Sequence, residues 1–216
     1  MTCSLSLFDV RKITGVMLSY MSDAGKNARS ESTEAKDYEE FFAEQLTKAQ
    51  YIIHIAMAKN SSKGYENALK ASKTFDNVLV VDSGHLSSGM GILALEAERC
   101  AAEGMSPEEI VKELESIKKR INTSFIVGST EYLARSGRIT PKINTICEAF
   151  MLHPVILLKK SSMTVSAIRI GMRDTIWRKY IKSTLKNAEN IDRQILFITH
   201  ICCFSCIAGV RRPLCA

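Results

Sequence analysis

The chain has 216 residues, of which 46% are hydrophobic and 24% are charged. This balance is ordinary for a soluble globular protein with one large or two small domains, and the length can bury a core without disulfide or metal staples. The net charge of +6 is uneven, because residues 159–216 hold eleven Lys and Arg against three Asp and Glu. Such a basic third could contact an acidic partner, an anionic membrane or nucleic acid, but we expect a solvated helix face at Arg173–Lys186 and no nucleic-acid partner.

The seven cysteines are odd in number and irregular in spacing, which argues against a disulfide framework and favours the reduced thiols of a cytoplasmic protein. Cys203-x-x-Cys206 has no second Cys or His pair at ligand spacing, so no metal site is expected. No segment typical of a signal peptide opens the chain. The longest apolar run, Ile195–Val210, is shorter than the ~20 residues of a spanning helix, and we expect no transmembrane segment.

The first half of the chain alternates between expected helices and strands. Residues 1–37 are poorly defined. The runs Tyr51–Met57 and Val78–Asp82 are nearly continuous and apolar, which is typical of strands covered on both faces. Apolar periodicity and end signals predict helices at Tyr38–Gln50, Gly64–Lys73 and Ser87–Glu103.

The clearest local signal is Ser106-Pro107-Glu108-Glu109, a capping box with Pro at the first helical position. The second half then continues the alternation, with strands near 123–127, 154–158, 163–170 and 194–200, a short helix at 130–135 and a basic helix at 174–186. This order favours an α/β fold whose sheet is mostly parallel, with helices on both faces.

Two further motifs are typical of enzymes. Gly89-x-Gly91-x-x-Ala94 fits the loose dinucleotide fingerprint, but it begins seven residues after Asp82 instead of in the turn that leaves the strand, and close helix packing also explains these glycines. Asp82, Ser83 and His85 contain the residue types of a hydrolase triad, yet sequence neighbours rarely converge, and we expect Asp82 and Ser83 to cap their loop instead.

Two histidines lie in apolar strands. His54 is expected to be a core residue. His200 ends the apolar run Gln194–Thr199, where a polar side chain would meet a crevice, which makes it a candidate functional residue.

One ordered set of motifs is more specific than any of these pieces. The set begins with Val78–Asp82 and Ser83-Gly84-His85, continues with Phe125-x-Val127-x-Ser129-x-Glu131-Tyr132-Leu133, and ends with Gly137-Arg138-Ile139. In order and spacing it resembles the pattern of the DegV family. The resemblance covers roughly residues 30–200. It implies an N-terminal α/β domain with helices on both faces of a parallel sheet and a second α/β domain, here incomplete. We assign residues 1–37 to an undefined segment, 38–150 to the first domain and 151–216 to a partial second domain with a Cys-rich tail.

The resemblance also implies a function. Family members bind one long-chain fatty acid, with a buried tail and a carboxylate held by hydroxyls and basic side chains, and present it to the catalytic subunit of a fatty acid kinase. The family protein is a carrier and not an enzyme, and it needs no cofactor beyond the bound fatty acid.

Carried over by motif, the family's serine-rich loop corresponds to Ala56–Tyr65, where Ser61 and Ser62 are the remaining hydroxyls. An upstream serine segment corresponds to Arg29–Thr33 and indicates Ser30 and Ser32. A basic position of the second domain corresponds to Arg169, and a strand-end histidine corresponds to His200. The lost serines leave a second hypothesis open, a regulatory or interaction module of the same fold that binds no lipid.

Overall fold

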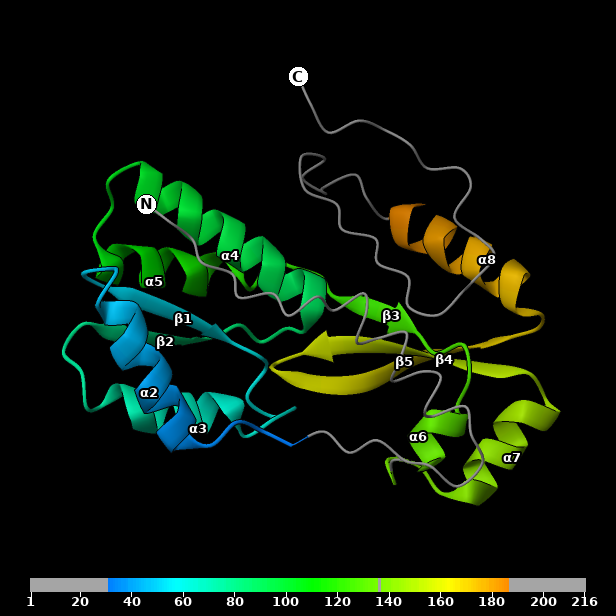
Figure 1. Ribbon diagram of the computed structural model, residues 1–216. Coiled ribbons are helices and arrows are strands. Elements are labelled where there is room, and N and C mark those ends of the chain that lie inside the picture. The colour runs from blue at the N-terminus through cyan, green and yellow to red at the C-terminus, as the bar shows by residue number, and fades with distance from the viewer. Residues whose placement is uncertain (1–30, 136, 187–216) are drawn as a thin grey trace.

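The computed structural model describes residues 31–135 and 137–186. It confirms an α/β fold, in which a parallel sheet with its helices lies beside an antiparallel sheet with helices of its own (Figure 1). The first part consists of α2 (Ala35–Leu46), β1 (Ile52–Ala56), α3 (Gly64–Ser72), β2 (Val78–Asp82), α4 (Ser87–Ala102) and α5 (Pro107–Ile117).

β1 and β2 pair in parallel, from Ile52 opposite Val78 to Ala56 opposite Asp82. Because successive strand side chains point to opposite faces, each strand feeds two hydrophobic clusters. Ile52 and Val78 pack with α2 and α3 around the fully buried Phe42. The alternate residues, with Val81 among them, pack with α4 and α5 around Leu93 and Leu114. Helices therefore cover both faces of this sheet, as the apolar runs predict.

The capping box is present as expected. Ser106 Oγ accepts a hydrogen bond from the Glu109 backbone N–H at 3.3 Å, and Glu109 Oε2 accepts one from the Ser106 N–H at 2.8 Å. The helix that follows buries Ile110, Leu114 and Ile117 against the core. This helix closes one face of the parallel sheet.

The second part differs from a continuation of the parallel sheet. β3 (Ser124–Ile126) pairs antiparallel with β4 (Leu152–Lys159), and β4 pairs antiparallel with β5 (Ser162–Ile170). Apolar periodicity does not encode strand direction, and two helices, α6 (Glu131–Arg135) and α7 (Pro141–Ala149), return the chain so that β4 runs against β3. The last described helix is α8 (Arg173–Lys186).

β3 belongs to the range 38–150 and β4 to the range 151–216, so a strand pair crosses the expected domain boundary. The division at residue 150 stays a prediction. β4 and β5 meet in a tight turn at Lys160 and Ser161, both with positive φ, which matches the twist of an antiparallel hairpin.

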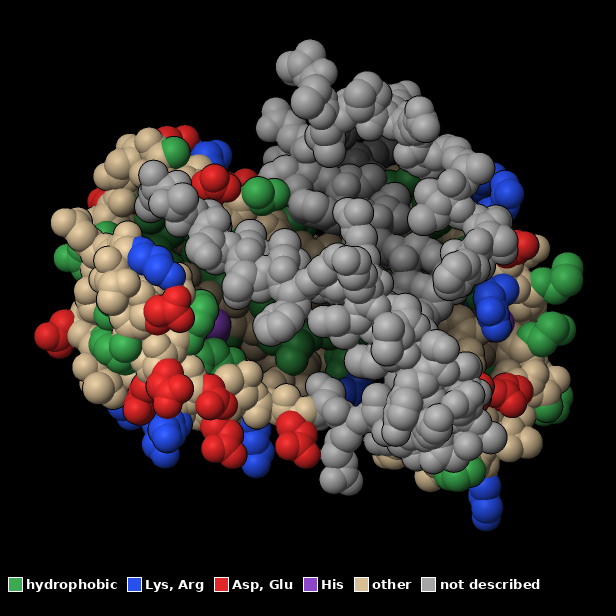
Figure 2. Space-filling model, viewed as in Figure 1, with side chains coloured by type: hydrophobic (Ala, Val, Ile, Leu, Met, Phe, Trp, Pro, Cys, Tyr) green, Lys and Arg blue, Asp and Glu red, His purple; other side chains and the backbone are tan. Residues whose placement is uncertain are grey.

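On the face seen in Figure 2, acidic and basic side chains are interspersed over the part of the surface formed by α2 and α3. Mixed charges of this kind are typical of a solvated surface. In the described part of the chain, no helix is long and apolar enough to cross a membrane.

Candidate functional site

The candidate site lies at the carboxyl end of the parallel sheet. Strands that run in parallel bring the loops after them to the same edge, where ligands of α/β proteins gather. The loop after β1, residues 57–63, carries two of the predicted serines, and the loop after β2 begins with Ser83. Backbone hydrogen bonds join the two loops, from Ser83 N to Ala56 O at 3.1 Å and from Ala58 N to His85 O at 2.9 Å.

Two predicted hydroxyls from distant parts of the sequence meet in front of α3. Ser32 Oγ and Ser62 Oγ are 2.9 Å apart and hydrogen bonded. Ser62 Oγ accepts a hydrogen bond from Gly64 N at 3.0 Å, and Ser32 Oγ accepts one from Lys63 N at 3.2 Å. The hydroxyls therefore satisfy backbone N–H groups at the start of the helix, a place where the helix dipole favours negative charge.

Ser61 lies directly beside this pair and differs from it. Its hydroxyl is buried and has no hydrogen-bond partner among the described residues. The backbone of the loop is nevertheless held, because Ser61 N donates to Ala58 O at 2.8 Å. A buried hydroxyl left unpaired costs about 1–3 kcal/mol, so an acceptor atom delivered by a ligand would be stabilised here. Ser61, and the hydroxyl of the Ser32–Ser62 pair that does not donate to the other, thus offer donors for an anionic group.

Arg169 is not brought to these serines. Its Nη2 donates to Ser183 Oγ of α8 at 3.3 Å. The hairpin tip adjoins the serine loop, since Asn60 Nδ2 donates to Ser162 Oγ at 2.9 Å. Arg169 lies seven residues further along β5 than Ser162, a length of at most about 24 Å at about 3.4 Å per residue. Ser30 and His200 lie outside the described residues and stay predictions.

The structure also bears on the two enzyme alternatives. Ser83 Oγ donates to the backbone carbonyl of His85 at 3.0 Å, and His85 Nε2 donates to the carbonyl of Lys118 at 3.0 Å. The serine hydroxyl and the imidazole therefore point to different backbone groups and do not form a nucleophile–base pair. As expected, Asp82 caps its loop, because Oδ1 accepts from Gly84 N at 3.0 Å.

The glycines of the loose fingerprint lie inside α4 and not in the turn that leaves β2. A Cβ at Gly89 would lie 2.7 Å from His85 Cβ and would also meet Thr123 Oγ1, whereas a Cβ at Gly91 would meet nothing within 4 Å. Gly89 is therefore explained by close packing of α4 and not by a pyrophosphate. Gly91 has no such packing reason.

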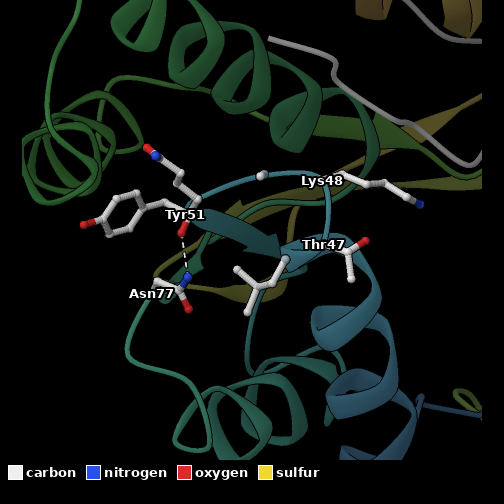
Figure 3. A pocket seen from close by; sticks show the side chains of 7 residues that line it. Thr47, Lys48, Tyr51 and Asn77 are labelled. Atoms are coloured by element: carbon white, nitrogen blue, oxygen red, sulfur yellow. Dashed lines mark hydrogen bonds between the residues drawn. The ribbon is translucent and has the colours of Figure 1, made fainter.

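A hollow of about 620 Å³ lies elsewhere. It is formed where α2 passes into β1, at the opposite, amino end of the sheet, and Asn77 Nδ2 donates to Gln50 O across it at 2.6 Å (Figure 3). The residues that line the hollow include one charged side chain, Lys48, and no cluster of hydroxyls. We place the candidate site at the serines because the polar groups converge there and the hollow offers only an open surface.

Among residues 31–135 and 137–186, no group of three or more His, Cys, Asp or Glu side chains is arranged to hold a metal ion. The Cys203-x-x-Cys206 pair lies outside these ranges. The hydroxyls of the described site can hydrogen bond to an anion.

Several known proteins are similar to this chain in sequence. A DegV domain-containing protein of Caldanaerobacter subterraneus is 28% identical over 165 residues, which are 76% of this chain and 58% of the relative. One of Clostridium acetobutylicum is 27% identical over 201 residues, or 87% of this chain and 72% of the relative.

Two solved structures show the same fold. A DegV family protein of Thermus thermophilus, described as binding fatty acid, superimposes with a TM-score of 0.69 at 23% identity and covers 82% of this chain and 63% of its own. The fatty acid kinase B3 protein of Streptococcus pneumoniae, loaded with linoleic acid, gives 0.67 at 17% identity and covers 86% of this chain and 64% of its own. The chain thus spans somewhat less than two thirds of these structures.

The family assignment rests on a match along most of the sequence. The family model described as "Uncharacterised protein, DegV family" matches residues 12–205. The matched range includes the serine loop, the strand Val78–Asp82 and the motifs from Phe125 to Ile139. This chain belongs to the DegV family.

Proposed function

We propose that this protein binds a long-chain fatty acid and holds its carboxylate at the hydroxyls of Ser32, Ser61 and Ser62. The observation that carries the proposal is the buried, unpartnered hydroxyl of Ser61 beside a hydroxyl pair at the start of α3. A carboxylate accepts up to about four hydrogen bonds and carries the negative charge that a helix N-terminus favours. The charge must be hydrogen bonded once it leaves water, since a bare buried carboxylate would protonate instead.

The acyl tail is the other half of the proposed ligand. Each methylene removed from water contributes about 0.8 kcal/mol, so a chain of 14–18 carbons supplies most of the binding energy, while the serines fix its orientation. The apolar side chains on both faces of the parallel sheet are the nearest source of such a lining. Fatty-acid-bound structures of the same fold support this part of the proposal.

The proposed role is that of a carrier that presents the carboxylate to the catalytic subunit of a fatty acid kinase. The motivation is the likeness in fold to the kinase B3 protein of Streptococcus pneumoniae. Ser30 and His200 are proposed as further head-group contacts on the motif resemblance alone. Arg169 is left out of the proposed head-group site, because its Nη2 donates to Ser183 on α8 and seven residues of β5 separate it from Ser162 at the hairpin tip.

A regulatory or interaction module without lipid is the second candidate. Large apolar side chains of the second part are exposed, among them Phe150 at 65% and Ile170 at 70%. Neighbouring exposed apolar groups mark interaction surfaces in many proteins. This candidate predicts that the purified protein ignores added fatty acid.

A titration of delipidated protein with oleate separates the two candidates. Replacing both loop serines, Ser61→Ala with Ser62→Ala, should weaken oleate binding by about tenfold or more, because two donors to a charged group are lost. Ser116→Ala is the matched control, since Ser116 lies exposed on α5 and should leave the affinity unchanged. Equal affinity of the double variant and the control would remove the loop serines from the site.

A further inference from the structure

We infer that Asp82 is a positioning residue that holds the serine loop in place for the ligand carboxylate, an inference that rests on the proposed function. Asp82 is the last residue of β2 and is only 9% exposed. A carboxylate this deeply buried must have its oxygens hydrogen bonded. The hydrogen-bond partners of the Asp82 carboxylate indicate its role.

Three segments of the chain converge on this one side chain. Oδ1 accepts from Lys59 N of the serine loop at 3.1 Å and from Gly84 N of its own turn at 3.0 Å. Oδ2 accepts from the hydroxyl of Ser161, at the tip of the β4–β5 hairpin, at 2.8 Å. The serine loop, the end of the parallel sheet and the antiparallel hairpin are therefore joined through a single buried group.

The contact between loop and hairpin is reinforced from the loop side. Asn60 Nδ2 donates to Ser162 Oγ at 2.9 Å and lies 3.5 Å from the carbonyl oxygen of Lys160. Asn60 stands between Lys59, whose backbone N–H donates to Asp82, and Ser61. The backbone leading to the two loop hydroxyls is thus fixed immediately before those hydroxyls, on one side by Asp82 and on the other by the hairpin tip.

The hairpin tip is itself shaped for this contact. Lys160 and Ser161 have φ values of 51° and 61°, the left-handed conformation that turns the Ser161 hydroxyl toward the sheet edge. Ser161 is 9% exposed, although tight hairpin turns usually face water. Ser161 is buried where its hydroxyl bonds to Asp82, whereas Lys160 of the same turn stays exposed.

This arrangement gives Asp82 an effect on ligand recognition that it exerts without touching the ligand. Removing its carboxylate leaves the N–H of Lys59 and the hydroxyl of Ser161 without their acceptor. The loop that carries Ser61 and Ser62 would then no longer be held in one geometry. In the proposed function the acyl tail is lined by apolar side chains and not by this loop, so the loss should fall on recognition of the carboxylate.

The test compares two ligands with the same tail. Dissociation constants of full-length protein for palmitate and for hexadecanol are measured in wild type, Asp82→Ala and Asp82→Asn. The control is Asp76→Ala, because Asp76 is exposed and lies before β2 at the opposite edge of the sheet. We expect Asp82→Ala to bind palmitate at least about tenfold more weakly while hexadecanol affinity is retained, so the acid-to-alcohol preference falls.

Asp82→Asn keeps an oxygen for the two backbone N–H groups and should recover much of the preference. Ser161→Ala removes only the bond to Oδ2, and it carries the test if Asp82→Ala fails to fold. We expect Ser161→Ala to lower the preference by a smaller factor. An unchanged preference in folded Asp82→Ala, or in Ser161→Ala where Asp82→Ala does not fold, overturns the inference and leaves the proposed function standing. A wild-type protein that binds neither ligand refutes the proposed function itself.

Discussion

Gly89 and Gly91 lie two residues apart in α4, and an added methyl group should affect the protein in opposite directions at the two positions. At Gly89 a Cβ would lie 2.7 Å from the Cβ of His85 and would also press on Thr123 Oγ1. The first of these atoms is tied to the backbone and cannot move away cheaply. At Gly91 no heavy atom lies within 4 Å of the new group.

The magnitudes follow from two terms. Replacing Gly by Ala in a helix is favourable by roughly 0.5–1 kcal/mol, because the unfolded chain loses conformational freedom. Overpacking costs about 1–3 kcal/mol. Gly91→Ala should therefore stabilise the protein by roughly 0.5–1 kcal/mol. The helix term is common to both variants, so Gly89→Ala should be less stable than Gly91→Ala by about 1–3 kcal/mol.

Urea denaturation followed by far-ultraviolet circular dichroism measures this difference directly. In a protein of this size each kcal/mol also corresponds to roughly 2–4 °C in the melting temperature, which gives a second readout. If Gly89→Ala proves as stable as Gly91→Ala, then α4 does not approach Thr123 and His85 as closely as described. The packing explanation of Gly89 would then be refuted.

Three further predictions concern the core and the site. Leu114→Ala removes a fully buried side chain and should lower the free energy of unfolding in urea by about 2–5 kcal/mol. Leu95→Ala, at a 45% exposed position, should change it by no more than about 0.5 kcal/mol. Equal losses in the two variants would contradict the described core. Burial lowers the pKa of His54 below its ordinary value, so the neutral form is favoured in the folded protein. The stability that this preference gives is present above about pH 6.5 and is lost as pH falls through the folded pKa. The melting temperatures at pH 7.5 and pH 5.5 should therefore differ more in wild type than in His54→Leu. Arg169→Ala should leave oleate affinity unchanged, because the side chain contacts Ser183 and not the serine loop; a weakened affinity would show that Arg169 reaches the ligand after all.

The environment of His54 explains the direction of the second of these predictions. Its ring packs edge-on against Tyr38 at 5.3 Å and Phe42 at 5.5 Å between ring centroids. These aromatic neighbours exclude water from the imidazole and offer no counter-charge, so the charged form is the one that burial penalises. His54 is only partly buried and belongs to neither of the two core clusters, so its predicted place in the core is met only in part.

Local elements were predictable because their signals are local. The strand Val78–Asp82 has the bounds that its apolar run indicates, and the helix after Ser106 begins where its capping box predicts. The same type of signal precedes α7, which is absent from the elements predicted above. Thr140 and Pro141 form an N-cap and first-turn pair, and Thr140 Oγ1 accepts from Ile143 N at 3.4 Å.

Contacts between distant segments were not predictable in the same way. The direction of β4 against β3 depends on how α6 and α7 return the chain, which no periodicity records. The pairing of Ser32 with Ser62 joins residues 30 positions apart and was indicated only by the family resemblance. The bond from Ser161 to Asp82 spans 79 positions, and the sequence predicts only the capping half of the role of Asp82.

The most direct test of fatty-acid binding is native mass spectrometry of the purified protein, followed by denaturation and identification of any released lipid. We predict one fatty acid of roughly 14–18 carbons per chain, and uptake of added oleate by protein that has been delipidated. A protein that emerges empty and remains empty after oleate is added would contradict the proposed carrier function.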